Sequence, residues 1–259
     1  MPKFESYAQG TPNWVELITP DQQAAKAYYG DLFGWDYEVN PVDDQGNVYL
    51  ISQLQGSRIA GIGGQLPELA GHPAFWNVYL AVDDVDAVTA LVAGAGGTVE
   101  AGPFDVVDAG RMAAIQDPTG ARVNLWQANR TVGTGLANEP GTPIWNELVS
   151  PDLDTATRFY SEILGVGWRP SEMVEGGDYT CLVVGDKPVG GAMPPQLEGI
   201  PPHWNVYFNV ADCDASMAKA VELGGAVTAP AFEVPGVGRM GFLTDPQGAM
   251  FALMQNPPS

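Results

Sequence analysis

The stretch FWNVYLAVDDVDA at residues 75–87 recurs almost unchanged as HWNVYFNVADCDA at residues 203–215, and each copy places Asn directly after Trp. Two further blocks repeat in the same order. TPNWVELITPD (11–21) returns as TPIWNELVSPD (142–152), and GRMAAIQDPTGARVNLWQ (110–127) returns as GRMGFLTDPQGAMFALMQ (238–255). Three blocks kept in register predict that the chain is a tandem duplication.

The two copies are joined by ANRTVGTGLANEPG at residues 128–141, which is rich in Gly, Asn and Thr and shows little periodicity. Such a stretch is typical of a connection between domains. We therefore expect a first domain over residues 1–128, a linker over 129–141 and a second domain over 142–259. Gly/Pro-rich connections at residues 63–73 and 190–202 divide each half again, so the chain contains four units.

Each unit has the outline of one strand, one helix and three strands. In the first unit NWVELIT alternates as a strand does, and Asp21 then caps a helix that Gly34 ends. Ala24, Tyr28 and Leu32 form the expected apolar stripe of that helix. In the second unit the DPTG turn at residues 117–120 joins the last two strands. Four such units predict an α+β protein with curved, largely antiparallel sheets.

Composition narrows the possible partners and the compartment. The chain has 259 residues, 45% of them hydrophobic, and a formal net charge of −20, which repels nucleic acid and anionic membrane surfaces. We expect neither as a partner. The N-terminus lacks the apolar segment of a signal peptide, and no apolar run is long enough to span a membrane. Cys181 and Cys213 follow no metal-binding spacing, and these features together favour a cytoplasmic protein.

Three motifs resemble those of the vicinal oxygen chelate superfamily of glyoxalases, bleomycin resistance proteins and dioxygenases. They are the D-x-x-x-A-x-x-F/Y-Y opening of a helix at residues 21–29 and 152–160, VDDVDA at 82–87, and two DP-x-G turns. The chain is most similar to two-domain actinobacterial members of the glyoxalase-like or hydroxylase-like type. The resemblance implies four tandem βαβββ units that form two incomplete barrels, each around a cavity. It leaves open whether a barrel forms within one half or across the two.

Enzymatic members of that superfamily usually hold a divalent metal on inward-facing strand positions. Carried onto this chain, the first position falls on Trp14 and Trp145, seven residues before the capping Asp, and the next falls on Asn77 and Asn205. The last falls on Asn124 and on Ala252. An indole nitrogen has no free lone pair, and a neutral amide is a weak ligand. Only two His exist, both in the Pro-rich connections, so we expect no divalent metal and no other cofactor.

The same strand positions predict a polar and aromatic pocket for a small molecule. The residues expected to face inward are Trp14, Glu16, Asn77, Tyr79, Asn124 and Trp126 in the first half and Trp145, Glu147, Asn205, Tyr207 and Met254 in the second. The alternative is that the Asn side chains only satisfy neighbours inside a packed barrel. Arg111 and Arg239 occupy matched strands. Each is expected to pair with the Glu of its half or to bind a ligand carboxylate or carbonyl.

Three functions remain open at this stage. The first is binding of a small organic molecule without a catalytic metal, for sequestration, sensing or resistance. The second is a glyoxalase-like lyase acting on reactive carbonyl compounds, with Glu16 or Glu147 as a general base whose pKa is raised by burial among aromatic side chains. The third is a scaffold whose cavities are filled. The chain is expected to be a monomer with an internal pseudo-dimer, or a homodimer.

Overall fold

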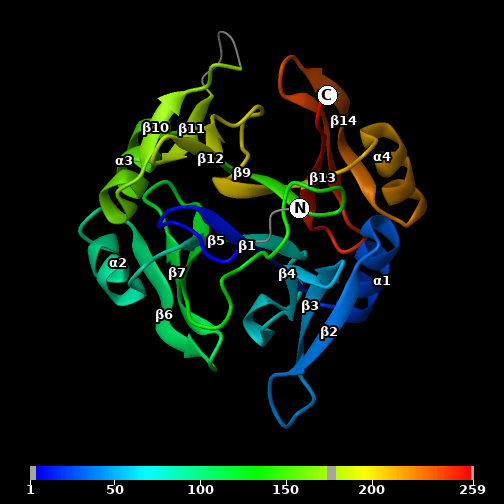
Figure 1. The fold of residues 1–259 in the computed structure, drawn as a ribbon, viewed down its shortest axis with the longest axis horizontal. Helices are drawn as coiled ribbons and strands as arrows, with labels where there is room; N and C mark the ends of the chain where they lie inside the picture. The colour runs from blue at the N-terminus through cyan, green and yellow to red at the C-terminus, as the bar shows by residue number, and fades with distance from the viewer. Residues whose placement is uncertain (1–3, 174–178, 258–259) are drawn as a thin grey trace.

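The first half of the computed structural model is one curved sheet with two helices on its outer side (Figure 1). The structure describes residues 4–173 and 179–257. The elements of the first half are β1 (Pro12–Thr19), α1 (Gln22–Phe33), β2 (Asp36–Pro41), β3 (Val48–Leu54), β4 (Ser57–Gly64), a short 3-10 helix (Pro67–Leu69), β5 (Phe75–Ala81), α2 (Val85–Val92), β6 (Thr98–Val106), β7 (Gly110–Gln116) and β8 (Arg122–Ala128).

The second half repeats this plan. Its elements are β9 (Pro143–Val149), α3 (Leu153–Leu164), β10 (Gly167–Pro170), β11 (Thr180–Val184), β12 (Lys187–Met193), β13 (His203–Asn209), α4 (Cys213–Glu222), β14 (Ala226–Val234), β15 (Gly238–Thr244) and β16 (Met250–Gln255). The predicted α+β fold of four βαβββ units is therefore confirmed, element by element.

Each barrel forms within one half of the chain. The strands of the first sheet follow the order β2-β3-β4-β1-β5-β8-β7-β6, and those of the second follow β10-β11-β12-β9-β13-β16-β15-β14. The first strands of the two units in a half are therefore antiparallel neighbours at the centre of each sheet. In their registers Glu16 lies opposite Asn77, and Glu147 lies opposite Asn205. This pairing sets the predicted polar side chains side by side on the concave face.

The helices begin and end where local sequence signals place them. The carboxylates of Asp21, Asp84, Asp152 and Asp212 accept hydrogen bonds from backbone N–H groups of the first turns. The predicted apolar stripe of α1 needs one correction. Ala24 is exposed, and Ala25 takes its place beside Tyr28, Tyr29 and Leu32, because these four lie on the face that packs against the core.

The two halves are joined by reciprocal contacts that explain the Trp of each Trp-Asn pair. The hydroxyl of Tyr29 donates to Asp245 Oδ2 at 3.0 Å and accepts from Trp76 Nε1 at 3.1 Å. In the equivalent arrangement of the second half, the Tyr160 hydroxyl donates to Asp117 Oδ2 at 3.2 Å and accepts from Trp204 Nε1 at 3.0 Å.

Because neighbours along a strand face opposite ways, Trp points to this interface while Asn points into the barrel. Figure 1 shows the resulting helix pairs, α1 beside α4 and α2 beside α3.

Within the described ranges, no helix is long and apolar enough to cross a membrane. Both cysteines are free thiols, and the Cys213 side chain lies buried in the core. Burial raises the pKa of Cys213 to about 11, so this thiol stays protonated and packs as an apolar group.

Candidate functional site

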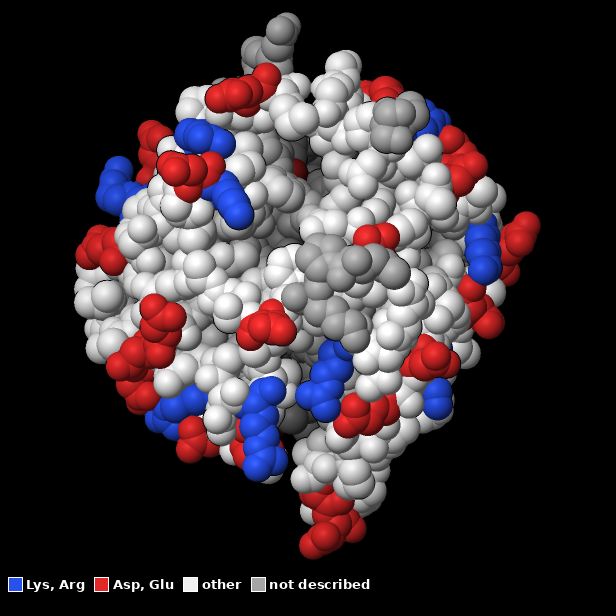
Figure 2. Space-filling view, viewed as in Figure 1, with Lys and Arg blue, Asp and Glu red and all other residues white. Residues whose placement is uncertain are grey.

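A cavity of about 960 Å³ lies within the second barrel. Figure 2 shows a hollow in the upper part of the molecule, between the β10–β11 side and the β14 side, with mostly uncharged walls. Its volume is typical of sites for drug-sized organic molecules. Side chains of the concave face and of the connections above it line the cavity, and among them are Trp145, Glu147, Tyr179, Cys181, Gln196, His203, Asn205, Tyr207, Phe232, Met240, Phe242 and Met254.

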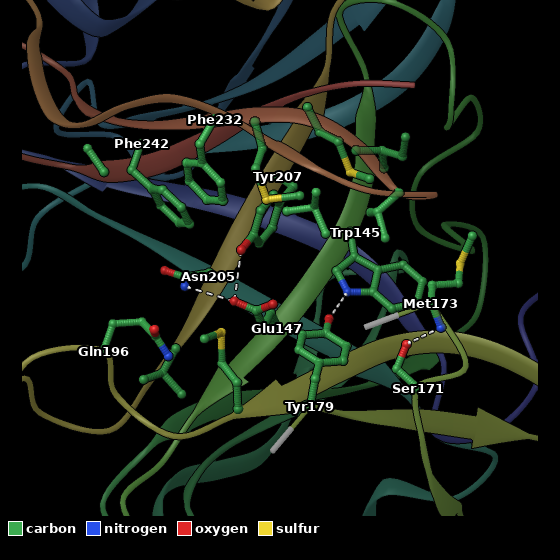
Figure 3. Close-up of a pocket in the computed structure, with 18 of the residues that line it drawn as sticks. Trp145, Glu147, Ser171, Met173, Tyr179, Gln196, Asn205, Tyr207, Phe232 and Phe242 are labelled. Carbon is green, nitrogen blue, oxygen red and sulfur yellow. Dashed lines mark hydrogen bonds between the residues drawn. The ribbon is translucent and has the colours of Figure 1, made fainter. Parts of the chain in front are cut away.

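The polar centre of this cavity is the carboxyl group of Glu147, which projects from β9. Tyr207, on the neighbouring strand, donates its hydroxyl to Glu147 Oε1 at 2.8 Å, and the Asn205 amide donates to the same oxygen at 3.4 Å (Figure 3). Trp145 Nε1 donates to the hydroxyl of Tyr179 at 2.7 Å. The predicted inward residues Trp145, Glu147, Asn205, Tyr207 and Met254 all line the cavity.

Burial raises the pKa of Glu147, because the carboxylate loses its hydration inside the barrel. Hydrogen bonds from Tyr207, Tyr179 and Asn205 lower that pKa and offset part of the effect, as does the charge of His203. The pKa values of Tyr179 and Tyr207 are raised by burial and by the nearby carboxylate, so both phenols stay protonated and act as donors.

The mouth of the cavity is ringed by exposed apolar side chains. Leu197 is 71% exposed, Met173 is 58% exposed, and Phe232 and Met250 are also exposed, and all four line the cavity. Phe232 stacks on Phe242, which in turn contacts Tyr207 edge to face. Exposed apolar groups gathered around an opening are typical of a site that binds an apolar molecule.

The equivalent positions of the first barrel are packed against one another. Trp14, Tyr79 and Trp126 form a buried cluster to which Met112 and Ile51 add. Beneath it Tyr79 donates to Glu16 Oε2 at 2.8 Å and Asn77 donates to the same oxygen at 3.4 Å, the contacts that Tyr207 and Asn205 make in the second half. Burial raises the pKa of Glu16 as well. The predicted inward residues thus come together, but around an aromatic cluster.

Three matched positions carry larger side chains in the first barrel than in the second. The first half has Trp126, Asn124 and Ile51 where the second has Met254, Ala252 and Cys181. The ring of Trp126 meets that of Tyr79 edge to face at 6.3 Å between centroids. Its Nε1 donates to the backbone carbonyl of Thr131 at 2.8 Å, so the segment that follows β8 holds the indole in place.

Both arginines lie away from the carboxylates that they were expected to pair with, so that expectation is wrong. Arg111 forms ion pairs with Asp86 of α2 and Asp105 of β6, and Arg239 forms one with Asp214 of α4. The reason is that both strands carry these arginines on the face that the helices cover. Arg239 does not line the cavity either. The positions of Arg111 and Arg239 therefore do not support the prediction that either one binds a ligand.

The sequence analysis missed several residues of the two sites, and three of them contact its predicted residues through polar atoms. Tyr179 and its equivalent Tyr49 accept from the Trp indoles and contact the two Glu carboxyls. A signal existed: Gly191 and Gly61 are matched glycines facing these tyrosines, and a Cβ at either position would overlap the phenol. The third is His203, whose Nε2 lies 3.0 Å from Asn205 Oδ1. Its place two residues before Asn205, on the same strand face, was the available signal.

The residues at the superfamily's metal positions fit an ion poorly. Both indole nitrogens donate to tyrosine hydroxyls, and both Asn amides donate to the Glu carboxyls. A third position is Asn124 in one half and Ala252 in the other. Over residues 4–173 and 179–257, no three His, Cys, Asp or Glu side chains gather closely enough to hold a metal. A single carboxylate with neutral or absent partners does not form the charged, converging site that a divalent cation needs.

The chain belongs to the glyoxalase/bleomycin resistance protein/dioxygenase superfamily, also called the vicinal oxygen chelate superfamily. The sequence model of that superfamily matches residues 11–125, and the model of the glyoxalase-like domain matches residues 147–254. Each match spans two βαβββ units. The predicted two-domain member of this superfamily is therefore confirmed.

Two kinds of relative share nearly the full length of the chain. CFP32 of Mycobacterium tuberculosis, provisionally named a glyoxylase, is 50% identical over 259 residues, which cover 100% of this chain and 99% of the relative. The anthracycline biosynthesis protein DnrV of Streptomyces peucetius is 36% identical and covers 96% of this chain and 94% of its own length. The chain is similar to both over both halves.

Solved structures of more distant proteins show the same fold. The Mn(II)-bound glyoxalase from Novosphingobium aromaticivorans superposes with a TM-score of 0.65 at 19% identity, over 96% of this chain and 83% of that one. The 2,3-dioxygenase LapB from Pseudomonas sp. KL28 gives 0.62 at 15% identity, over 97% and 94%. At such identities the likeness concerns the fold, and function depends on the site.

Proposed function

We propose that this protein binds a small, largely apolar organic molecule in the cavity of its second barrel, without a catalytic metal, in a role such as sequestration or resistance. The observation that carries the proposal is the cavity of about 960 Å³ with one buried carboxyl group, Glu147, at its polar centre. A pocket lined by apolar and aromatic groups around a few fixed polar ones is typical of small-molecule sites.

The lining favours a planar aromatic ligand with a hydrogen-bond donor. Trp145, Tyr207, Phe232 and Phe242 offer ring faces and edges to a flat molecule. Glu147 offers a carboxyl oxygen to a hydroxyl or amine of the ligand. The net charge of −20 disfavours anionic molecules, so we expect the ligand to be neutral or cationic.

The relatives support this ligand class. DnrV is named as an anthracycline biosynthesis protein, and it is similar to this chain over nearly its full length. We therefore include polycyclic aromatic phenols and quinones of the anthracycline type among the expected ligands. The exposed apolar side chains of Leu197 and Met173 at the mouth suit a molecule that extends beyond the barrel.

A fluorescence titration with an anthracycline tests the proposal. We expect saturable binding of one molecule per chain. Replacing Glu147 by Gln removes the ionisable acceptor and is expected to weaken binding about tenfold, the effect of one hydrogen bond to a charged group. The matched variant Glu16→Gln alters the equivalent carboxyl of the first barrel and is expected to leave affinity unchanged.

Two outcomes of that titration would contradict the proposal. One is a linear, non-saturating response at all concentrations. The other is an equal loss of affinity in Glu16→Gln, which would place the ligand outside the second barrel. Metal analysis of the dialysed protein gives a separate test, because stoichiometric Zn, Ni, Mn or Fe would overturn the metal-free part.

A second candidate is a lyase acting on reactive carbonyl compounds, in keeping with the glyoxylase name of CFP32. It is favoured by the raised pKa of Glu147, which suits a general base next to a carbonyl, and by Tyr207 at 2.8 Å from that carboxyl. Turnover of an α-oxoaldehyde that is lost in Glu147→Gln and kept in Glu16→Gln would support this reaction. Turnover retained by both variants would exclude Glu147 as the base.

A further inference from the structure

His203 stands at the start of β13 with both ring nitrogens against oxygen atoms. Its Nδ1 lies 2.8 Å from the carbonyl oxygen of Pro201, and its Nε2 lies 3.0 Å from Oδ1 of Asn205. A backbone carbonyl only accepts, and an amide oxygen also accepts. Both contacts are satisfied at once only when both ring nitrogens carry hydrogen, that is, when the ring is an imidazolium.

The Asn205 side chain connects that ring to the cavity. While its Oδ1 faces His203, its Nδ2 faces Glu147 and donates to Oε1 at 3.4 Å. A neutral ring with hydrogen on Nδ1 would present a bare Nε2 to the amide, so the amide would have to turn over. It would then direct its oxygen at Glu147, and only a protonated carboxyl group satisfies that contact. The charge of the ring and that of the carboxyl are therefore linked through one amide.

Among the described groups that face Glu147, His203 is the one that can carry a positive charge. From β13 come Asn205 and Tyr207, and Tyr179 is the residue just before β11. Both phenols stay protonated, because burial raises their pKa values. The partner of Glu147 on β12 is Gly191, which has no side chain. Opposite His203 on β9 lies Val149, which is uncharged.

We infer that His203 is a positioning residue for Glu147: as an imidazolium held by Pro201, it bonds the oxygen of the Asn205 amide that donates to the carboxyl group, and its positive charge keeps that group ionised as an acceptor for ligand. The inference rests on the proposed function for its use, since it states how the second barrel presents Glu147 to a bound molecule. The first half has Phe75 at the matched position, so Glu16 has the amide contact of Asn77 but lacks the positive charge.

Carboxyl ¹³C labels on the glutamates allow a test in the absence of any ligand. The Glu147 signal is the one missing from Glu147→Gln, and its shift is followed against pH. We expect His203→Phe, which copies the first half, to raise the pH at which Glu147 titrates by about one unit, since a nearby positive charge is lost. His203→Gln retains a hydrogen-bonding side chain without charge and is expected to raise it equally.

The first half supplies the reverse experiment. Phe75→His places an imidazole two residues before Asn77, and we expect it to lower the pH at which Glu16 titrates. His72→Gln removes the other histidine of the chain and serves as the control, with no expected change at Glu147. Thermal melts of each variant establish that it is folded.

An unchanged Glu147 titration in both His203 variants would overturn the inference. So would a shift in His203→Phe alone, because loss of the hydrogen bond, and not of the charge, would then act on Glu147. No ligand takes part in this titration. If the protein failed to bind a ligand, the effect of His203 on Glu147 could still be measured, so the two failures are distinguishable.

Discussion

The two barrels share their strand order and their buried Glu, yet they differ in what stands above that carboxyl group. Over Glu16 the rings of Trp14, Tyr79 and Trp126 pack together, whereas Glu147 faces a cavity of about 960 Å³. The hydrogen bonds to the two carboxyl groups are nevertheless the same, with a Tyr hydroxyl at 2.8 Å in each. A duplicated fold can therefore keep its polar framework in both copies while one copy contains a cavity above it and the other an aromatic cluster.

The comparison predicts first that the aromatic cluster stabilises the first barrel. Trp126→Ala should lower the free energy of unfolding by about 3–5 kcal/mol, the cost of removing a large buried side chain. Urea denaturation measures the loss. Met254→Ala, at the matched position beside the cavity, serves as the control and should cost far less, because that side chain already borders open space. Equal losses would mean that the two barrels are equally packed.

Filling the second barrel is expected to abolish the proposed binding of ligand. The double variant Ala252→Asn, Met254→Trp gives the second barrel two side chains of the first half, and Met254 lines the cavity. We expect anthracycline affinity to fall about 100-fold, or about 2.7 kcal/mol, because the ring of the new Trp occupies the space of the ligand. A fluorescence titration measures the affinity. Unchanged affinity with a folded protein would show that the ligand binds elsewhere.

At the interface between the halves, the comparison predicts that two matched substitutions cost the same stability. Tyr29→Phe and Tyr160→Phe each remove the hydroxyl between a Trp indole and an Asp carboxylate, contacts that match within 0.2 Å. Each variant should lose about 1–2 kcal/mol of stability, since buried polar partners are left unsatisfied. Urea denaturation of both proteins measures the two losses. A large difference between them would show that the pseudo-symmetry of the interface is only geometrical.

The smallest expected effect concerns pH. Because the pKa of Glu16 is raised in the folded chain, protonation stabilises the fold, and that contribution is full below the unfolded value near 4.5 and lost as pH rises through the folded value. Glu16→Gln should therefore raise the melting temperature by about 2–4 °C at pH 8 and have little effect at pH 4. Melting curves across this range measure the change. The gain should be smaller for Glu147→Gln, where His203 already offsets the charge. A gain at pH 4 equal to that at pH 8 would contradict the linkage.

Much of the fold was predictable because its signals are local and occur twice. The capping aspartates, the alternating strands and the DP-x-G turns all act over a few residues, and the structure confirms the βαβββ order that they predict. The inward placement of Glu16 and Glu147 was also predictable, from strand alternation. The predicted apolar stripe of α1 was wrong by one residue, at Ala24. Ala24 and Ala25 are equally apolar, and only the packing of the helix against the core determines which of them is buried.

The arginines and His203 show where local signals end. Arg111 lies on β7, a strand of the first barrel, yet its partners are Asp86 and Asp105, which come from other elements. Which face of a curved strand meets a helix depends on how the whole sheet bends. In the same way, His203 directly follows the Pro-rich connection at residues 190–202, and its contact with Asn205 depends on β13 beginning at His203.

From the sequence alone came the duplication, the superfamily resemblance and the strand positions that converge on each barrel, because periodicity and motif spacing are properties of the chain order. The tertiary structure alone decided that the second barrel holds the cavity. The room inside a barrel is what remains after side chains from several strands, and the segment around Thr131, have been packed together. The volume of the cavity therefore depends on how all these side chains pack together, and no single stretch of sequence predicts it.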